Sequence, residues 1–428
     1  MQKQKNKQTG ITLIALVVTV IILIILAGVS INMLVGENGI ITQAQTTKEE
    51  TKESTASEIV SIAVLGATKE NGNIDVAQLK KEIESRGGTL SSDTLPTTIT
   101  LDGYLFKVDR NGNIEQRKQG GTLATVTGEE TSNTTVEDAI GNKVVVPAGF
   151  IVVNPEDYVT DGIVIQKVSN GNQYVWIPCT TDSSDTSKLQ YQRTEWGVEA
   201  DNDTVALKDE LTLTEASVTY TTEDIENGIN TTVSAEIVEQ INSEKASIEQ
   251  YGGYYIGRYE TGNVSNTAVI QQNVEPYASV KWSVAYSLAK EIDVGSAATS
   301  YLCSSYAWDT AINFIQNNTT WSNYATSREN TNDNWLDKKV VDVNGAVIKE
   351  AGIPTRLKTG LTTAKANIYD MGGNVGEFTT ELKPGVVESV VLRGGVYGNT
   401  INPTGDRWDS IPSDSSSGYG FRATLFLK

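Results

Sequence analysis

The chain begins with a short basic leader that is followed by one long apolar segment. Lys3, Lys5 and Lys7 precede the apolar residues 11–35, and no charged residue lies between Lys7 and Glu37. As a helix this segment would extend about 37 Å, enough to cross a hydrocarbon core of about 30 Å. The positive-inside rule keeps the lysines in the cytoplasm. We therefore expect a single-pass membrane protein whose C-terminal part is extracellular.

The pattern after the membrane segment predicts a small α+β stalk domain. A polar extension continues the first helix to residue 66. A second helix is expected at residues 75–86, with Val76, Leu79 and Ile83 on one face and a glycine pair as its stop. Residues 98–109 alternate as one strand, and residues 113–116 return after a turn. We place this stalk domain at residues 67–117, after a leader at 1–10 and a helix with its polar extension at 11–66.

The rest of the chain predicts a linker and one large domain. Residues 118–143 begin with a stretch rich in Gly, Thr and Ser, which is typical of a linker. The second domain spans residues 144–428. It contains a polar interval at about 180–245, within which we expect strands at 211–220 and a helix at 232–249. The fold class is therefore α+β, and the large domain is expected to be rich in irregular loops.

Composition removes several classes of function. The chain has 53 Asp and Glu against 34 Lys and Arg, a formal net charge of −19, which argues against nucleic-acid binding. It contains no histidine, which excludes a Ser-His-Asp triad and histidine-ligated metal sites. Cys179 and Cys303 are the two cysteines, and they could be buried thiols or one disulfide.

The order of leader, glycine and apolar helix resembles the type IV prepilin start. In that family a prepilin peptidase cuts after the glycine, which implies cleavage between Gly10 and Ile11. The family usually has Glu at the fifth mature position, where it guides assembly with other pilin subunits, whereas this chain has Ala15. The resemblance therefore implies a membrane-anchored or pilus-associated protein at the cell surface. A plain N-terminal anchor is the alternative.

An ordered set of short segments in the large domain resembles the formylglycine-generating-enzyme (sulfatase-modifying factor) family. The family core is a variant of the C-type lectin fold, and a prepilin-like start with such a domain is familiar in exported Gram-positive proteins. The most specific segments are the last three. The set comprises residues 173–178, 253–260, 276–285, 305–314, 368–377, 392–397 and 418–422.

The glycine-rich turn at residues 370–377 carries two carboxylates, a spacing of hard oxygen ligands that suits Ca²⁺. In the family this turn holds calcium. The resemblance implies the side chains of Asp370 and Glu377 and the carbonyls of Gly373 and Val375 as ligands, with Asn374 supporting the turn. The alternative is a metal-free turn held by its own hydrogen bonds. Gly376 stands where the family usually has Trp.

Two arginines and three tryptophans are expected to be structural. Arg393 and Arg422 lie in family segments, and a buried arginine commonly forms a bidentate pair with a carboxylate. Trp176, Trp282 and Trp308 lie in patterned apolar segments and are predicted to be core residues.

Residues 396–417 decide between an enzyme and a binding protein. In the active enzymes this stretch carries the two cysteines that bind copper, and here it has none, so we expect no copper and no enzyme. In variable proteins of diversity-generating retroelements the same stretch is the hypervariable ligand-binding face. Aromatic and short polar side chains suit such a surface. The predicted ligand-binding residues are Tyr397, Asn399, Thr400, Asn402, Asp406, Arg407, Trp408, Asp409 and Ser410.

These observations leave three alternative functions for the protein. The first is an adhesin-like surface protein that binds an extracellular protein or glycan through residues 396–417. The second is an exported formylglycine-generating-type oxidoreductase, which would need Cys179 or Cys303 at its site. The third is a structural pseudopilin.

Overall fold

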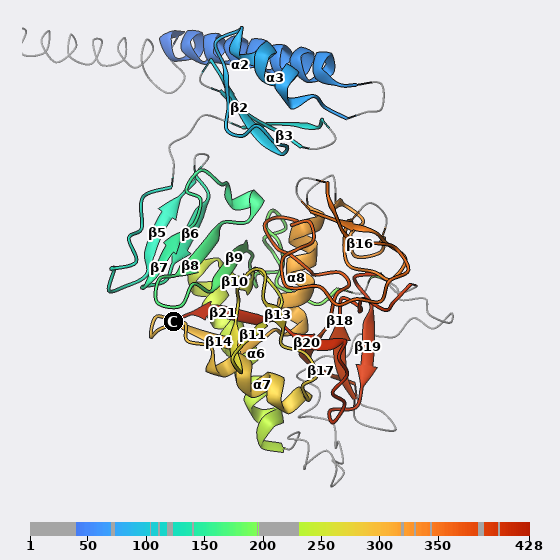
Figure 1. Ribbon diagram of the computed structural model, residues 1–428. Helices are drawn as coiled ribbons and strands as arrows, with labels where there is room; N and C mark the ends of the chain where they lie inside the picture. The colour runs from blue at the N-terminus through green and yellow to red at the C-terminus, as the bar shows by residue number, and fades with distance from the viewer. Residues whose placement is uncertain are drawn as a thin grey trace, which may run out of the picture. The chain divides into compact units, whose positions relative to one another are not determined.

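The computed structural model divides the chain into two compact units, Met1–Gln119 and Gly120–Lys428 (Figure 1). The residues that it describes are 40–69, 73–102, 104–109, 112–117, 123–138, 141–194, 196, 231–317, 321–328, 331–342, 345–383, 389–400 and 403–428. Within these ranges no helix is long and apolar enough to cross a membrane. The predicted leader, its cleavage site at Gly10 and Ile11, and the apolar segment 11–35 lie outside them.

The described part of the first unit is a four-stranded sheet with two helices. Strands β1 (Thr89–Leu90), β2 (Thr97–Leu101), β3 (Tyr104–Val108) and β4 (Ile114–Arg117) form an antiparallel sheet in sequence order. Helix α2 (Ile40–Ala67) packs on α3 (Val76–Glu84). The side chain of Asp75 caps α3 by accepting a hydrogen bond from the amide of Gln78, which stabilises the helix start. The helix predicted at residues 75–86 is confirmed.

One predicted strand of this unit is in fact a hairpin. Residues 98–109 form β2 and β3, which pair with each other in antiparallel register. Asp102, which lies between them, has a φ of 51°. Asp followed by Gly is a strong signal for a two-residue hairpin turn, since both turn positions require positive φ. The alternating pattern continued on both sides of this pair and hid the turn.

The second unit begins earlier than the predicted linker allows. Strand β5 (Thr134–Glu137) pairs with β6 (Lys143–Val146), and Leu123 and Val126 are buried in the core of this unit. The linker predicted at residues 118–143 therefore does not extend that far. Glycine and threonine content suggested a spacer, but the few apolar side chains in the stretch are buried in the core.

A six-stranded antiparallel sheet forms the centre of the second unit. Its order is β14-β21-β10-β9-β8-β7, so strands β9 and β10 are neighbours although the polar interval separates them in sequence. Helices α6 (Thr231–Tyr251) and α7 (Trp282–Glu291) pack on its strands, as β10 with α6 and β14 with α7. The strands are β7 (Phe150–Val152), β8 (Val164–Lys167), β9 (Gln173–Pro178), β10 (Gly253–Gly257), β14 (Ala298–Leu302) and β21 (Ala423–Leu427).

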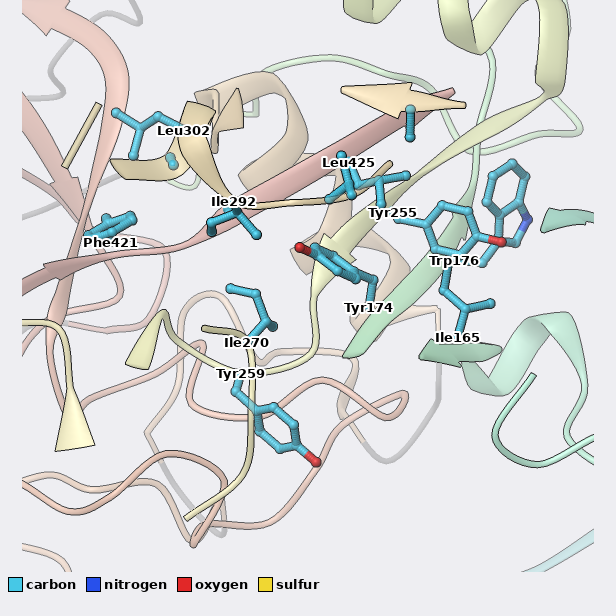
Figure 2. Packing of buried hydrophobic residues seen from close by; sticks show 14 of the residues in the cluster. Ile165, Tyr174, Trp176, Tyr255, Tyr259, Ile270, Ile292, Leu302, Phe421 and Leu425 are labelled. Atoms are coloured by element: carbon cyan, nitrogen blue, oxygen red, sulfur yellow. The ribbon is translucent and has the colours of Figure 1, made fainter. Parts of the chain in front are cut away.

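Large aromatic and aliphatic side chains fill the core around this sheet. Figure 2 shows Trp176 of β9 and Tyr255 of β10, whose ring centroids lie 4.9 Å apart. Trp176, Trp282 and Trp308 are all buried, which confirms them as core residues. Burying large rings of this kind stabilises a core strongly, because each removes much apolar surface from water. The predicted helix at 232–249 is present as α6, and the predicted strands at 211–220 lie outside the described residues.

A second, four-stranded sheet positions the candidate site. Its order is β19-β18-β17-β20, with β17 and β20 parallel and the other pairs antiparallel. The strands are β17 (Gly376–Lys383), β18 (Ser389–Arg393), β19 (Arg407–Ser410) and β20 (Tyr419–Phe421). Helix α8 (Ser305–Gln316) packs on β17.

Shorter elements complete the second unit. They are the turn η1 (Val159–Asp161) and the strands β11 (Gly262–Val264), β12 (Thr267–Val269), β13 (Glu275–Pro276), β15 (Val340–Val341) and β16 (Val347–Lys349). The described chain is thus a mixed α+β protein, as the sequence predicts. Cys179 and Cys303 are both buried, and they form no disulfide with each other.

Candidate functional site

The four-stranded sheet has one apolar face and one ionic face. Trp408, Leu392 and Phe378 are opposite one another on β19, β18 and β17, and all three contact the main core. Arg407, Arg393 and Glu377 form the next row in the same register. Because side chains directly opposite on neighbouring strands share a face, the first row faces the core and the second lies on the other face.

Two carboxylates form ion pairs with three arginines, and one of these arginines, Arg407, belongs to residues 396–417. Asp309 of α8 accepts a hydrogen bond at Oδ1 from Nη1 of Arg393, at 2.5 Å, and Arg407 donates to its Oδ2. Glu381 of β17 accepts from Nε of Arg407 at 3.1 Å and from Arg193 at 3.3 Å. All five side chains are at least nine-tenths buried. Such a paired network fixes geometry, because removing one partner leaves a buried charge uncompensated.

A third buried pair lies at the other end of the sheet. Nε of Arg422 lies 2.9 and 3.1 Å from the two oxygens of Glu377, and Nη2 lies 2.5 Å from Oε1. The indole of Trp308 donates to Glu377 at 3.0 Å. Burial raises the pKa of Glu377, and Arg422 opposes that rise. The structural roles predicted for Arg393 and Arg422 are confirmed.

The turn at residues 370–377 is held by its own polar groups. Asp370 has a φ of 58° and accepts hydrogen bonds from the hydroxyl of Thr362 at 2.5 Å and the amide of Gly360 at 2.6 Å. Asn374 donates to the buried carboxylate of Glu260 at 2.7 Å. Burial, followed by the charge of Asp370, raises the pKa of Glu260 well above its usual range.

These contacts do not fit a calcium site at the turn. Both oxygens of Asp370 accept hydrogen bonds, and both oxygens of Glu377 accept from Arg422. A carboxylate paired with a guanidinium in this way is not open to a hard cation, which takes six to eight oxygen ligands. Over the described ranges, no group of three or more Cys, Asp or Glu side chains is arranged to hold a metal ion. The geometry favours the metal-free alternative.

The predicted ligand-binding residues separate into exposed and buried sets. Thr400 and Asp409 are exposed, while Tyr397, Asn399 and Trp408 are partly buried. Asn402 lies outside the described residues. Asp406, Arg407 and Ser410 face into the fold; Asp406 accepts from the amide of Arg407, and Ser410 donates to Asp414. We assign these three to the framework that supports the exposed residues, in place of the ligand contact that the sequence predicts.

Hydrogen bonds fasten both ends of residues 396–417. The amide of Tyr397 donates to the carbonyl of Asn374 at 2.9 Å, and its hydroxyl lies 3.1 Å from Oγ of Ser417. Arg356 donates to the carbonyl of Ser417 at 2.8 Å, and Arg328 donates to that of Thr400. The exposed positions are therefore presented from fixed ends.

Sequence reasoning missed the carboxylates of this framework. Asp309 and Glu260 lie inside segments that carry the family resemblance, and Glu381 follows Glu377 on β17. The available signal was a charged residue within a predominantly apolar stretch, as with Asp309 between Trp308 and Ala311. Such a residue is buried only when it has a partner.

The sequence matches no family model and no curated protein. Five chains of solved structures are similar to this one. The "Crystal Structure of CarF" has a TM-score of 0.28 at 14% identity, over 41% of this chain and 87% of that chain. "Treponema denticola variable protein 1" has a TM-score of 0.21 at 18% identity, over 44% of this chain and 66% of that chain. Both TM-scores are low, so neither match assigns a function. The prepilin-like and enzyme-like resemblances stay predictions.

Proposed function

We propose that this protein is a cell-surface, adhesin-like binding protein whose ligand contacts residues 396–417. One observation carries the proposal. This segment presents exposed polar groups at Thr400 and Asp409 beside partly buried aromatic rings, while Asp406 is buried and Arg407 pairs with the buried Asp309. A binding surface needs exposed contact groups on a support that does not move, because ordering a flexible loop on binding costs affinity.

The proposed contact residues are those of residues 396–417 whose side chains are not fully buried. Thr400 and Asp409 offer exposed polar groups, and Tyr397 and Trp408 offer partly buried aromatic rings. The ring of Trp408 packs edge-on against Tyr419, with 6.2 Å between the ring centroids, and also contacts the main core, so this partly buried ring is held in place. Held aromatic rings beside short polar groups are typical of recognition surfaces for proteins and glycans. We further propose that the exposed positions vary among related copies of the gene.

The proposed location rests on the sequence. The lysines of the leader and the apolar residues 11–35 support export of everything that follows. Ala15 supports an anchor or a minor pilus component over a major pilus subunit. We propose a membrane anchor at 11–35, processing by prepilin peptidase after Gly10, and an extracellular second unit.

Burial of the thiols favours binding over oxidase chemistry. Burial raises the pKa of Cys179 well above its usual range, and Cys303 is fully buried. A reactive cysteine needs a lowered pKa and access to its substrate. The second function, a formylglycine-generating oxidoreductase, would require both thiols to leave the core. The third function, a structural pseudopilin, does not account for exposed polar groups beside aromatic rings on a support held by buried ion pairs.

The proposal is tested with the purified full-length chain on a printed glycan array and on immobilised collagen, fibronectin and mucin. We expect binding to at least one probe, and loss of that binding in the Thr400→Ala/Asp409→Ala double variant. Lys188→Ala is the matched control, because Lys188 is an exposed residue in a different part of the unit. Binding that both variants retain would move the interface elsewhere. A lack of binding to every probe would favour the pseudopilin.

Variation is tested separately at the gene. We expect a reverse-transcriptase gene nearby and a near-repeat of the codons for residues 393–422. If both are missing, the proposal of diversification is withdrawn and the binding assay still decides the rest.

A further inference from the structure

A lysine and an aspartate meet inside the second unit, away from the ionic network described above. Nζ of Lys365 lies 2.5 Å from Oδ1 of Asp333, and the two side chains are 1% and 0% exposed. Nζ also donates to the carbonyl of Thr363 at 3.0 Å. It lies 5.2 and 5.0 Å from the ring centroids of Trp321 and Tyr324. The pair is thus fully removed from water and lies among aromatic rings.

The second oxygen of Asp333 faces two hydroxyl groups. Oδ2 of Asp333, the hydroxyl of Tyr324 and Oγ1 of Thr404 converge on Gly372, at 3.0, 3.0 and 2.6 Å from where a Cβ on that glycine would stand. Within the described part of the chain, none of these three atoms makes a hydrogen bond of standard geometry. Burial and then the charge of Asp333 raise the pKa of Tyr324, so this hydroxyl remains protonated and able to donate. A side chain on Gly372 would fill the point at which they meet.

From this geometry we propose that Lys365 and Asp333 join in an intramolecular isopeptide bond. Burial raises the pKa of Asp333, although Lys365 opposes that rise, and so favours a carboxylic acid in contact with the amine-bearing side chain of Lys365. These two groups are the reactants for an amide. Their contact also supplies the proximity that makes an intramolecular reaction favourable without an external catalyst.

The proposed reaction is a condensation that needs no oxidant, reductant or co-reactant. One ammonium proton moves from Nζ to the carboxylate, and the amine lone pair attacks Cγ of Asp333. The negative charge that develops on Oδ2 accepts hydrogen bonds from the hydroxyls of Tyr324 and Thr404, in the manner of an oxyanion hole. The bond from Cγ to the other oxygen then breaks, and one water leaves with that oxygen and two protons. The product is an Nζ–Cγ amide.

The bond would tie two loop segments of the second unit. Asp333 precedes Asn334, which forms a β-bridge with Gly373 of the turn. Lys365 itself forms a β-bridge with Ile368. Thr404 belongs to residues 396–417, so the proposed binding segment contributes one side chain to the reaction site. Neither cysteine forms a disulfide in this structure, so this amide would be the covalent tie of the unit.

Mass spectrometry of the full-length wild-type protein tests the proposal directly. We expect the chain to be about 18 Da lighter than its processed sequence requires, the mass of the water lost on amide formation. Trypsin should fail to cut after Lys365, and a branched peptide should join residues 329–338 to the peptide that begins at residue 359. Full mass with normal cleavage after Lys365 would overturn the proposal.

Variants separate the bond from other losses of water. Lys365→Arg keeps a cation at this position and should show the full mass. Tyr324→Phe removes one proposed oxyanion donor, and we expect a smaller linked fraction in freshly purified protein. An equal linked fraction in Tyr324→Phe and wild type would overturn the role given to that hydroxyl. A loss of about 18 Da that persists in Lys365→Arg would place the dehydration elsewhere and overturn the bond itself.

Discussion

Arg422 and Glu377 form a fully buried bidentate ion pair that joins the end of β20 to the start of β17. The same guanidinium donates to the carbonyls of Gly257 at 2.8 Å and Tyr369 at 2.9 Å. One side chain therefore holds together strand β10, the turn before β17 and β17 itself.

We expect Arg422→Met to lower the free energy of unfolding by about 3–5 kcal/mol, because it leaves the carboxylate of Glu377 buried without its partner. Urea unfolding followed by tryptophan fluorescence measures the change. Lys188→Met is the control, since its pair with Asp185 is exposed and such pairs contribute about 0–1 kcal/mol. Equal effects of the two substitutions would contradict the framework role of Arg422.

Substitutions at two positions of β19, Arg407 and Asp409, should differ greatly in their effect on the free energy of unfolding. Arg407→Met breaks contacts with Asp309 and Glu381, so we expect a loss of about 3 kcal/mol or more. Asp409→Ala changes an exposed residue and should stay within about 0.5 kcal/mol of wild type. The same urea titration measures both. A large loss in Asp409→Ala would place that residue in the framework as well.

Glu244 of α6 should make stability depend on pH near neutrality. Its carboxylate is buried between Tyr191, Gln240 and Ser304, and burial raises its pKa to about 7, although hydrogen bonds from those residues and the charge of Lys245 oppose the rise. The folded state therefore binds the proton more tightly than the unfolded state. This contribution is fully present below the unfolded pKa of about 4.5 and is lost as pH rises through about 7.

The comparison of wild type with Glu244→Gln isolates this group, because other buried acids titrate in both proteins. Between pH 5 and pH 8, the free energy of unfolding of wild type should fall relative to the variant by about 2.5 kcal/mol. Urea titrations at four pH values give the difference. Parallel curves for the two proteins would show that Glu244 remains ionised throughout.

Calcium removal should leave the second unit unchanged. Asp370 and Glu377 use their oxygens within the protein, so we expect chelation to remove no ion from this turn. We expect the melting temperature of the full-length chain to be the same in EDTA and in millimolar calcium. A rise with calcium that Asp370→Asn abolishes would restore the metal site that the family resemblance implies.

Neither thiol should react with thiol reagents in the folded protein. Cys179 and Cys303 are buried and are not joined by a disulfide. We expect no reaction with Ellman's reagent under native conditions and two thiols per chain in urea. A thiol that reacts at the rate of free cysteine in the native protein would reopen the oxidoreductase alternative.

Local patterns predicted much of the secondary structure. The apolar spacing of Val76, Leu79 and Ile83 gave α3, and a polar helical stretch gave α6. The prediction of a single strand at residues 98–109 was wrong, because the alternation of apolar and polar residues runs through the turn at Asp102 without a change of period. Composition wrongly predicted a linker over the whole of residues 118–143, because the apolar residues there are too few to form a pattern and are nevertheless buried.

The candidate site was harder to predict because its partners are distant in sequence. The sequence identified Arg393 and Arg422 as structural but could not pair Arg407 with Asp309, about a hundred residues away. An arginine next to Trp and Asp is equally typical of a recognition surface and of a buried network. Three-dimensional neighbours decide between these alternatives, and those depend on how α8 packs on β17.

Buried positions within residues 396–417 limit which positions a diversifying process can use. A library that randomised every codon from 396 to 417 would mostly encode chains that fail to fold, because Thr404, Asp406 and Arg407 are buried within that same stretch. A library restricted to the exposed positions Thr400 and Asp409 would keep its members folded. Tolerated variation should therefore be interrupted, with fixed positions between the changing ones.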